Sequence, residues 1–519
     1  MLYADLIVTG ANLITLDAAK PRATAMAIRD GRIIAVGDGS DVLPLAGAHT
    51  QRLDLAGKTV TPGFCDSHIH LAWYGLQLLQ QADLVGSTSI DEHLGRLSNL
   101  AKKTSGWIQG HGFDQDKLAE RRFPTRAELD TVSRDRPILI SRICGHAIVV
   151  NSAALAHASD ALRAAGDERN GLYVEDHATA FYGFIPPASE EQLEQAVLLA
   201  ANVALRTGIT SVHTLLDYPA QMIGYSRLHQ RGRLPIRVTG IPSYHAAKHL
   251  HGLGIRTGFG DDRLRFGGAK FFSDGSLGAQ TALLAEPYTD KPATRGIRMY
   301  DPQDLKEKAR DAQQKGWQIA IHAIGDQALR ETIDAIEFAL DGEDNAIHRH
   351  RVEHASLAPP DCVERMARLK IVATLQPQFV TSDTWTPDRL GPRRSRWAYP
   401  FKTLLRAGVP ITLSSDCPVE RLDAFACIAS AVGRHAWSPD ETLTPEEAIR
   451  AYCLGSAYAG HVDDRLGSLE VGKLADFVVL SDDPARLDAS AIAKLRAEQV
   501  FVNGHRVGAG AAETAGIRS

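Results

Sequence analysis

The chain has 519 residues, of which 44% are hydrophobic and 23% are charged, and its formal net charge at pH 7 is −5. This mild acidity differs from the basic surface of a nucleic-acid-binding domain, and no apolar run reaches the roughly 18 residues that a membrane span requires. The six cysteines are scattered and form no CxxC pair, so we expect a reduced, cytoplasmic protein without a disulfide framework.

The two ends of the chain are predicted to form one β-rich domain. In the first 60 residues, segments such as ADLIVTG and AMAIRDGRIIAVG group β-branched residues around Asp30-Gly31, which is a hairpin signal. The C-terminal segments KLADFVVL and QVFVNGHRVG have the same character, with a second hairpin signal at Asn503-Gly504. We therefore predict a composite β-sandwich built from residues 1–60 and 464–519.

The middle of the chain alternates short apolar strands with helical patterns. The predicted strands are residues 60–70, 208–214, 235–241, 265–272, 317–323, 350–355, 371–377 and 410–416. Strands and helices that alternate in this way predict an α/β fold, specifically a (β/α)8 TIM barrel over residues 61–463. The interval after the first strand is too long for one crossover, so residues 72–190 are predicted to be an inserted subdomain that caps the substrate site.

The first predicted strand ends in two histidines, within TPGFCDSHIH at residues 61–70. Residues i and i+2 of a strand share a face, so Asp66, His68 and His70 point one way and Cys65 points the other. Neutral imidazole is the commonest side-chain metal ligand. The pair alone is weak evidence, because two histidines at a strand edge also occur as ordinary hydrogen-bonding neighbours.

Other predicted strands end in polar side chains too. Lys270 lies on the fourth strand, His322 ends the fifth, His354 ends the sixth, and Asp416 ends the eighth. In a barrel these ends meet at one rim, where catalytic groups gather. Each residue has an ordinary alternative, such as a hydrogen-bonded core histidine, a capping aspartate or a lysine that reaches solvent. Their occurrence on one rim favours a metal site over these alternatives.

Several motifs follow one another in a specific order: TVTPGFCDSHIHL, AKFFSDGSLGAQTALL, IHAIGDQAL, RVEHAS, SSDCPV and GSLEVGKLADFVVL. As an ordered set, and over nearly the whole chain, they resemble the metal-dependent amidohydrolase superfamily, in its amidohydrolase-3 branch of YtcJ-like proteins and N-substituted formamide deformylases. The resemblance implies a barrel with a β-sandwich from both termini. It also implies a set of metal ligands, namely His68, His70, His322, His354 and Asp416.

The chemical state of Lys270 determines how many metal ions the site is predicted to hold. The resemblance places it where related enzymes carry a carboxylated lysine that bridges two metals. An unmodified ammonium group would repel a dication, so we favour the carboxylated form with two metals. The alternative is an unmodified Lys270 beside a single metal. Zn²⁺ suits histidine and carboxylate ligands, and other divalent metals remain open.

Substrate contacts are predicted from the loops and the insertion. His146 is the second predicted catalytic residue beside Asp416, because an imidazole there could bind the substrate and polarise its carbonyl opposite the metal. The chain has Cys144-Gly145-His146 where relatives often have Asp-Gly-His, a departure that bears on substrate preference. For the other predicted contacts, turn or cap chemistry is an equal alternative. They are Trp73, Tyr74, Asp114, Arg142, Asp274, Ser276 and Gln376.

The predicted activity is hydrolysis of a C–N bond in an amide, N-formyl or cyclic amide substrate. A metal-activated hydroxide would attack the carbonyl, with Asp416 as general base and then general acid. The alternatives are a deaminase or isomerase on the same scaffold and, less favoured, a non-catalytic scaffold of this fold. The expected partner is a small-molecule substrate, with no nucleic acid and no membrane, and a homodimer is left open.

Overall fold

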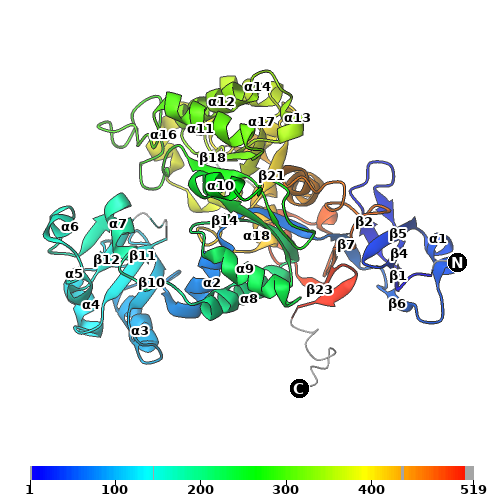
Figure 1. Ribbon diagram of the computed structural model, residues 1–519, viewed down its shortest axis with the longest axis horizontal. Coiled ribbons are helices and arrows are strands. Elements are labelled where there is room, and N and C mark those ends of the chain that lie inside the picture. The colour runs from blue at the N-terminus through cyan, green and yellow to red at the C-terminus, as the bar shows by residue number, and fades with distance from the viewer. Residues whose placement is uncertain (1–2, 144, 146, 434–437, 509–519) are drawn as a thin grey trace. The chain divides into compact units, whose positions relative to one another are not determined.

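The computed structural model describes residues 3–143, 145, 147–433 and 438–508. The chain divides into two compact units, one formed by residues up to Leu71 together with those from Ala201 onward, and one formed by Ala72–Ala200. Figure 1 follows the chain through its elements by colour and label. The predicted mixed α/β fold is confirmed.

Parallel strands form the centre of the first unit, in two sheets whose orders are β16-β15-β14-β8 and β17-β18-β19-β20-β21. Every neighbouring pair in both sheets is parallel. The strands are β8 (Phe64–Ile69), β14 (Ile209–Leu216), β15 (Arg237–Pro242), β16 (Leu264–Phe266), β17 (Ala269–Phe272), β18 (Ile319–Ala323), β19 (Arg351–His354), β20 (Val372–Leu375) and β21 (Ile411–Leu413). Their order in the sheets follows the chain, as repeated strand–helix units require.

Two of the predicted strands are divided at glycines. The segment 60–70 forms β7 (Thr59–Pro62) and β8, which belong to different sheets, because the chain turns at Gly63, where a Cβ would come within 2.1 Å of Thr210 Oγ1. The segment 265–272 likewise forms β16 and β17, separated by Gly267 and Gly268. The sequence pattern predicted each pair as one strand, because the residues on both sides of the glycines are apolar.

Hydrogen bonds join the two parallel sheets at their outer strands. A parallel bridge pairs Ser243, after β15, with Lys270 on β17. At the other edge, Asp416 N donates to His68 O over 2.9 Å and His70 N donates to Cys417 O over 2.8 Å. These contacts bring the end of β8 beside the end of β21, which matters for the site described below.

Helices connect and cover the parallel strands, and α10, α11 and α12 pack on β17 and β18 (Figure 1). In α12 the apolar face buries Leu329, Ile333 and Ile336, and the helix ends where Asp341 takes a left-handed conformation. The helices of this unit are α1 (Gly39–Val42), α9 (Gln221–Gln230), α10 (Tyr244–His251), α11 (Pro302–Gln314), α12 (Asp326–Leu340), α13 (Asn345–His348), α14 (Pro360–Arg368), α15 (Phe379–Ser382), α16 (Thr386–Arg394), α17 (Phe401–Arg406), α18 (Ala424–Val432), α19 (Pro445–Arg450), α20 (Ser456–Ala459) and α21 (Ala489–Ile492).

Both ends of the chain contribute to two further sheets of the first unit. One has the order β5-β4-β1-β6, and the other, β24-β23-β22-β7-β2-β3, combines strands from both termini. One hydrophobic cluster draws on both sheets, including Val8, Met26, Phe477 and Phe501. The strands are β1 (Leu6–Thr9), β2 (Asn12–Ile14), β3 (Arg22–Ala23), β4 (Ala25–Arg29), β5 (Arg32–Gly37), β6 (Gln51–Asp54), β22 (Phe477–Leu480), β23 (Ala497–Val502) and β24 (His505–Val507).

The second unit contains the segment that the sequence predicted as an insertion. Its sheet has the order β13-β12-β11-β10-β9, with a hydrophobic cluster on each side of it. Its elements are β9 (Gln81–Asp83), α3 (Ile90–Ala101), β10 (Ile108–Phe113), α4 (Arg126–Val132), β11 (Ile138–Arg142), β12 (Ala147–Val150), α5 (Ser152–Leu155), α6 (Asp160–Ala164), β13 (Leu172–Val174) and α7 (Glu175–Tyr182). The helices α2 (Leu71–Gln80) and α8 (Glu190–Arg206) lie where the two units meet in the sequence. Within the described ranges, no helix has the length and apolar character to cross a membrane.

Candidate metal centre

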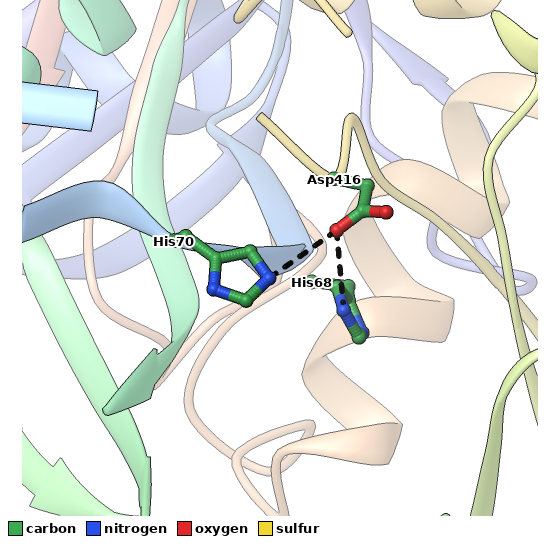
Figure 2. A group of neighbouring side chains, drawn as sticks. All are labelled: His68, His70 and Asp416. Carbon is green, nitrogen blue, oxygen red and sulfur yellow. Dashed lines mark ion pairs between the residues drawn. The ribbon is translucent and has the colours of Figure 1, made fainter. Parts of the chain in front are cut away.

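Three polar side chains meet where β8 and β21 end. Asp416 Oδ1 lies 3.3 Å from His68 Nε2 and 3.5 Å from His70 Nε2, and the three ligand atoms lie within 4.8 Å of one another. Figure 2 shows both imidazole rings beside the Asp416 carboxylate. The spacing of two residues along the chain puts both rings on the same side of the strand end.

The backbone around these residues is held in an uncommon conformation. Asp416 has a φ of 57° and His354, at the end of β19, has a φ of 77°. Non-glycine residues adopt such left-handed angles rarely, and the strain persists only where the surroundings impose it. The buried Asp66 carboxylate supplies part of that constraint, since it accepts a hydrogen bond from Ser415 N over 3.0 Å and another from Tyr452 Oη over 2.9 Å.

The other ring nitrogen of each histidine contacts a further carboxylate, a different one for each ring. His68 Nδ1 forms an ion pair with Glu353, and His70 Nδ1 lies 2.5 Å from Asp217 Oδ1. Each Nε2 is then directed at Asp416. Histidines that bind metals are usually held in this way, because the outer carboxylate fixes the ring orientation and strengthens the ligand.

Asp217 and Glu353 were not predicted from the sequence. Asp217 directly follows β14, at the same rim as the predicted ligands. Glu353 lies two residues after Arg351 on β19, and both side chains are fully buried. A charged pair inside a strand of the predicted barrel was the signal that could have identified Glu353, because buried charges need partners.

Two further predicted ligands lie beside this group. The His354 ring is 4.9 Å from the His68 ring, centroid to centroid, and His354 Nδ1 is 3.9 Å from Asp416 Oδ2. The His322 ring is 4.4 Å from the His354 ring, while its Nε2 lies 3.0 Å from the Gly275 carbonyl oxygen. His322 is therefore adjacent to the cluster, with Nε2 held by backbone.

Lys270 is buried on β17, with 4% of the residue exposed. Its Nζ has no hydrogen-bond partner in the part of the chain that the structure describes, and it lies 4.8 Å from the centroid of the Phe272 ring. Burial lowers the pKa of Lys270 to about 8, against the charges of Glu353 and Asp416. An amine in this position is not the solvent-reaching lysine of the ordinary alternative.

The remaining electrostatics follow from burial and neighbouring charge. Burial by itself would lower the pKa of His70, yet Asp217 and Asp416 raise it to about 9. Burial lowers the pKa of His354 to about 3, which keeps its ring neutral. Burial would raise the pKa of Asp416, but the neighbouring histidines, His68 foremost, hold it well below its usual range. Once the His70 ring gives up its proton, the carboxylate and the imidazoles form a donor set suited to a divalent metal.

The predicted substrate contacts of the first unit have structural partners. The Asp274 carboxylate is buried and accepts hydrogen bonds from the backbone N–H groups of Leu283, Ile324 and Gly325. Ser276 Oγ accepts a hydrogen bond from Ala279 N.

Gln376 is also buried and contacts two residues near the candidate ligands. Its Oε1 lies 2.9 Å from His354 Nδ1, and its Nε2 donates to Ser414 Oγ. Gln376 thus orients a candidate ligand, which is a role that the sequence did not suggest.

The other predicted contacts belong to the second unit. Trp73 and Tyr74 lie half-buried on α2. Arg142, at the end of β11, forms an ion pair with Asp114 over 3.3 Å. His146, together with its neighbour Cys144, lies outside the described residues.

The residues present suit a divalent metal. Lys270 Nζ is buried and lacks a hydrogen-bond partner among the described residues, and the buried Asp416 Oδ1 contacts the two histidine Nε2 atoms without forming a hydrogen bond to them. Desolvating such atoms is costly unless something binds them, so their gathering beside oriented imidazoles points to a ligand that the side chains were arranged to hold. A cation would meet a carboxylate oxygen and two directed Nε2 atoms at one point.

Such a site at the carboxyl ends of parallel strands is typical of metal-dependent hydrolases with an α/β fold. The chain belongs to the amidohydrolase family, whose family model matches residues 51–507.

The sequence comparisons agree with this assignment. The chain is 33% identical to the putative amidohydrolase YtcJ of Bacillus subtilis, over 94% of this chain and 96% of the relative. It is 28% identical to the N-substituted formamide deformylase of Arthrobacter pascens, over 96% of this chain and 97% of the relative. Among solved structures, an uncharacterized metal-dependent hydrolase from Pyrococcus furiosus is similar with a TM-score of 0.80 and 33% identity, covering 93% of this chain and 100% of that one. The predicted family is therefore confirmed.

Proposed function

We propose that the protein is a metal-dependent hydrolase that cleaves a C–N bond in an amide, N-formyl or cyclic amide substrate. The observation that carries the proposal is the convergence of His68 Nε2 and His70 Nε2 on Asp416 Oδ1, with each Nδ1 held by a carboxylate. The family and the relatives above support a hydrolase. A formamide, an amide and a cyclic amide share the carbonyl carbon and leaving nitrogen that this site would act on.

The metal is proposed to be Zn²⁺, held by His68, His70 and Asp416, with His354, His322 and Lys270 completing the ligand set. A bound divalent metal would acidify a water molecule and polarise the scissile carbonyl. Asp416 Oδ1 lies against both Nε2 atoms and belongs to the ligand set, which leaves Oδ2 for the proton. We infer that Oδ2 accepts a proton from the attacking water and delivers it to the leaving nitrogen.

Lys270 is proposed to be carboxylated when the site is loaded. Its buried amine, without a hydrogen-bond partner among the described residues, would attack carbon dioxide, form an N–C bond and release one proton. The product is an anion that can bridge two metals, whereas the ammonium form would repel them. Two metal ions per chain are therefore expected.

The proposal also covers the closed barrel, the β-sandwich, the capping segment and the cellular location. We infer that the two parallel sheets close into the (β/α)8 barrel, because hydrogen bonds and a bridge already join their outer strands. The two sheets built from the termini would form the composite β-sandwich. Capping of the substrate site by residues 72–190, the role of His146 in polarising the carbonyl, a cytoplasmic location and a small-molecule partner stay predictions.

The first test is the metal content of protein purified without chelators, measured by elemental mass spectrometry. We expect about two equivalents of divalent metal per chain, falling after His70→Ala because the loss removes an Nε2 ligand. The exposed His505 supplies the matched control, and His505→Ala should keep the full content.

The metal-loaded protein is then incubated with a panel of N-formyl, linear and cyclic amides, and the products are identified. Release of an amine together with a carboxylic acid, or ring opening by water, is the expected outcome. Release of ammonia without a carboxylic acid would favour a deaminase instead. About one equivalent of metal would contradict the carboxylated Lys270, and no binding even from added metal would overturn the proposed function.

A further inference from the structure

A pocket lies at the opposite ends of the strands that carry the candidate ligands. It has a volume of about 320 Å³, which is within the range of small-molecule sites. Trp317 and Gln318 line it and directly precede β18, and His348 lines it from the segment before β19. His322 lies near the far end of β18, so about 15 Å of strand separates it from the pocket.

The pocket is lined by a buried arginine that forms no ion pair within the described ranges. Arg265, on β16, is only 9% exposed, and its Nε has no hydrogen-bond partner. No ion pair involves Arg265 within the described ranges. The nearby Asp262 carboxylate is engaged by Arg465. Burial and the neighbouring Arg465 lower the pKa of Arg265 against the charges of Asp262 and Asp464, so its own charge is only partly compensated.

A buried arginine on the adjacent strand does form an ion pair with a carboxylate. Arg237, on the adjacent strand β15, is equally buried, but its Nε and Nη2 donate to the two oxygens of Asp476 over 2.7 and 2.8 Å. Arg265 has no equivalent carboxylate. Its Nη2 instead lies beside Gly258, which also lines the pocket, where an added Cβ would be 3.3 Å away. The Arg265 guanidinium therefore faces the pocket.

The rest of the lining also favours a negative ligand. Trp317 is 2% exposed, and its indole Nε1, which can only donate, has no hydrogen-bond partner among the described residues. No aspartate or glutamate lines the pocket. A cation would be repelled by Arg265, whereas an oxyanion could accept from its guanidinium.

We propose that this pocket is a binding site for a small oxyanion, either free phosphate or a phosphate group carried by a small molecule. The Arg265 guanidinium supplies the charge and a fork of donors, and the Trp317 indole N–H supplies a further donor. The site is separate from the candidate metal centre and does not depend on the proposed hydrolase activity.

Calorimetric titration of the metal-loaded full chain with inorganic phosphate tests the proposal. We expect a saturable site whose affinity falls by about tenfold or more in Arg265→Gln, because a charge-assisted contact is lost. Trp317→Phe should weaken it by about threefold, since the ring is kept and one neutral hydrogen bond is lost. Arg486→Gln, at an exposed arginine, is the matched control and should bind as the wild type does.

The design separates this pocket from the metal centre. Phosphate bound at the metal would bind wild type and Arg265→Gln equally, so equal affinities would overturn the proposal. The proposal also fails if wild type shows no saturable binding at millimolar phosphate. Circular dichroism and melting curves show whether each variant is folded. If Arg265→Gln does not fold, Trp317→Phe decides, and wild-type affinity in that variant would then count against the site.

Discussion

Replacing Asp416 by asparagine is expected to lower the turnover of a hydrolysed amide by about 10³-fold, the size of effect that a positioned general acid–base group contributes. Asparagine keeps the shape of the side chain and tolerates the left-handed φ of 57° at this position, so the strand end should stay in place. It cannot accept a proton, and it removes the negative charge that faces His68 Nε2 and His70 Nε2. Steady-state rates on a substrate found in the amide panel measure the effect.

The control for this prediction is Asp160→Asn, at a fully exposed aspartate whose change should leave the rate within about twofold, as expected for a surface substitution remote from the site. Metal content should be measured on the same preparations, because an Asp416 variant that has lost its metal would be inactive for that reason alone. Partial metal retention with a rate near wild type would refute the proton-transfer role. A fall in the rate without loss of metal supports it directly.

Much of this centre could be predicted because catalytic groups of an α/β fold come from strand ends. The sequence placed His68, His70 and Asp416 at the ends of two strands that are far apart in the chain, and the structure brings their ligand atoms within 4.8 Å of one another. Strand positions followed from apolar runs, which burial on both sides of a parallel sheet imposes. The divided strands at Gly63 and Gly267-Gly268 were not predictable in this way, because both halves of each segment are apolar.

The partners of the ligands were harder to predict, because they depend on contacts across the fold. Asp217 reaches His70 from β14, and Gln376 reaches His354 from the end of β20, and neither contact has a sequence pattern. Asp274 was predicted as a substrate contact, and its carboxylate also has a structural role, because it accepts hydrogen bonds from three backbone N–H groups and lies 3.4 Å from His322 Nε2. Residue type and position alone cannot separate these two roles.

Glu353→Gln is expected to lower both the stability of the protein and its affinity for the metal. Glu353 is fully buried and lies between two groups, accepting hydrogen bonds from the Arg351 guanidinium and holding His68 Nδ1. The variant leaves the buried Arg351 charge uncompensated, for which the expected loss of stability is about 3–5 kcal/mol. It also faces His68 Nδ1 with a neutral amide, so metal affinity should fall by about 10- to 100-fold. Melting curves and chelator competition measure the two effects.

A surface pair of the same residue types provides the control. Glu286 and Arg393 form an ion pair with side chains 57% and 63% exposed, and Glu286→Gln should leave the melting temperature nearly unchanged and the metal bound. If Glu353→Gln behaves in the same way, the buried pair does not support the site.

The double variant Arg351→Met/Glu353→Gln separates the two consequences. Without the buried Arg351 charge it should recover part of the melting temperature, although the Arg351 contacts to Ser67 O and His213 Nδ1 are also lost. It should keep the low metal affinity, because His68 Nδ1 still faces an amide. Recovery of both properties would mean that Arg351, and not the orientation of His68, decides how tightly the metal is held.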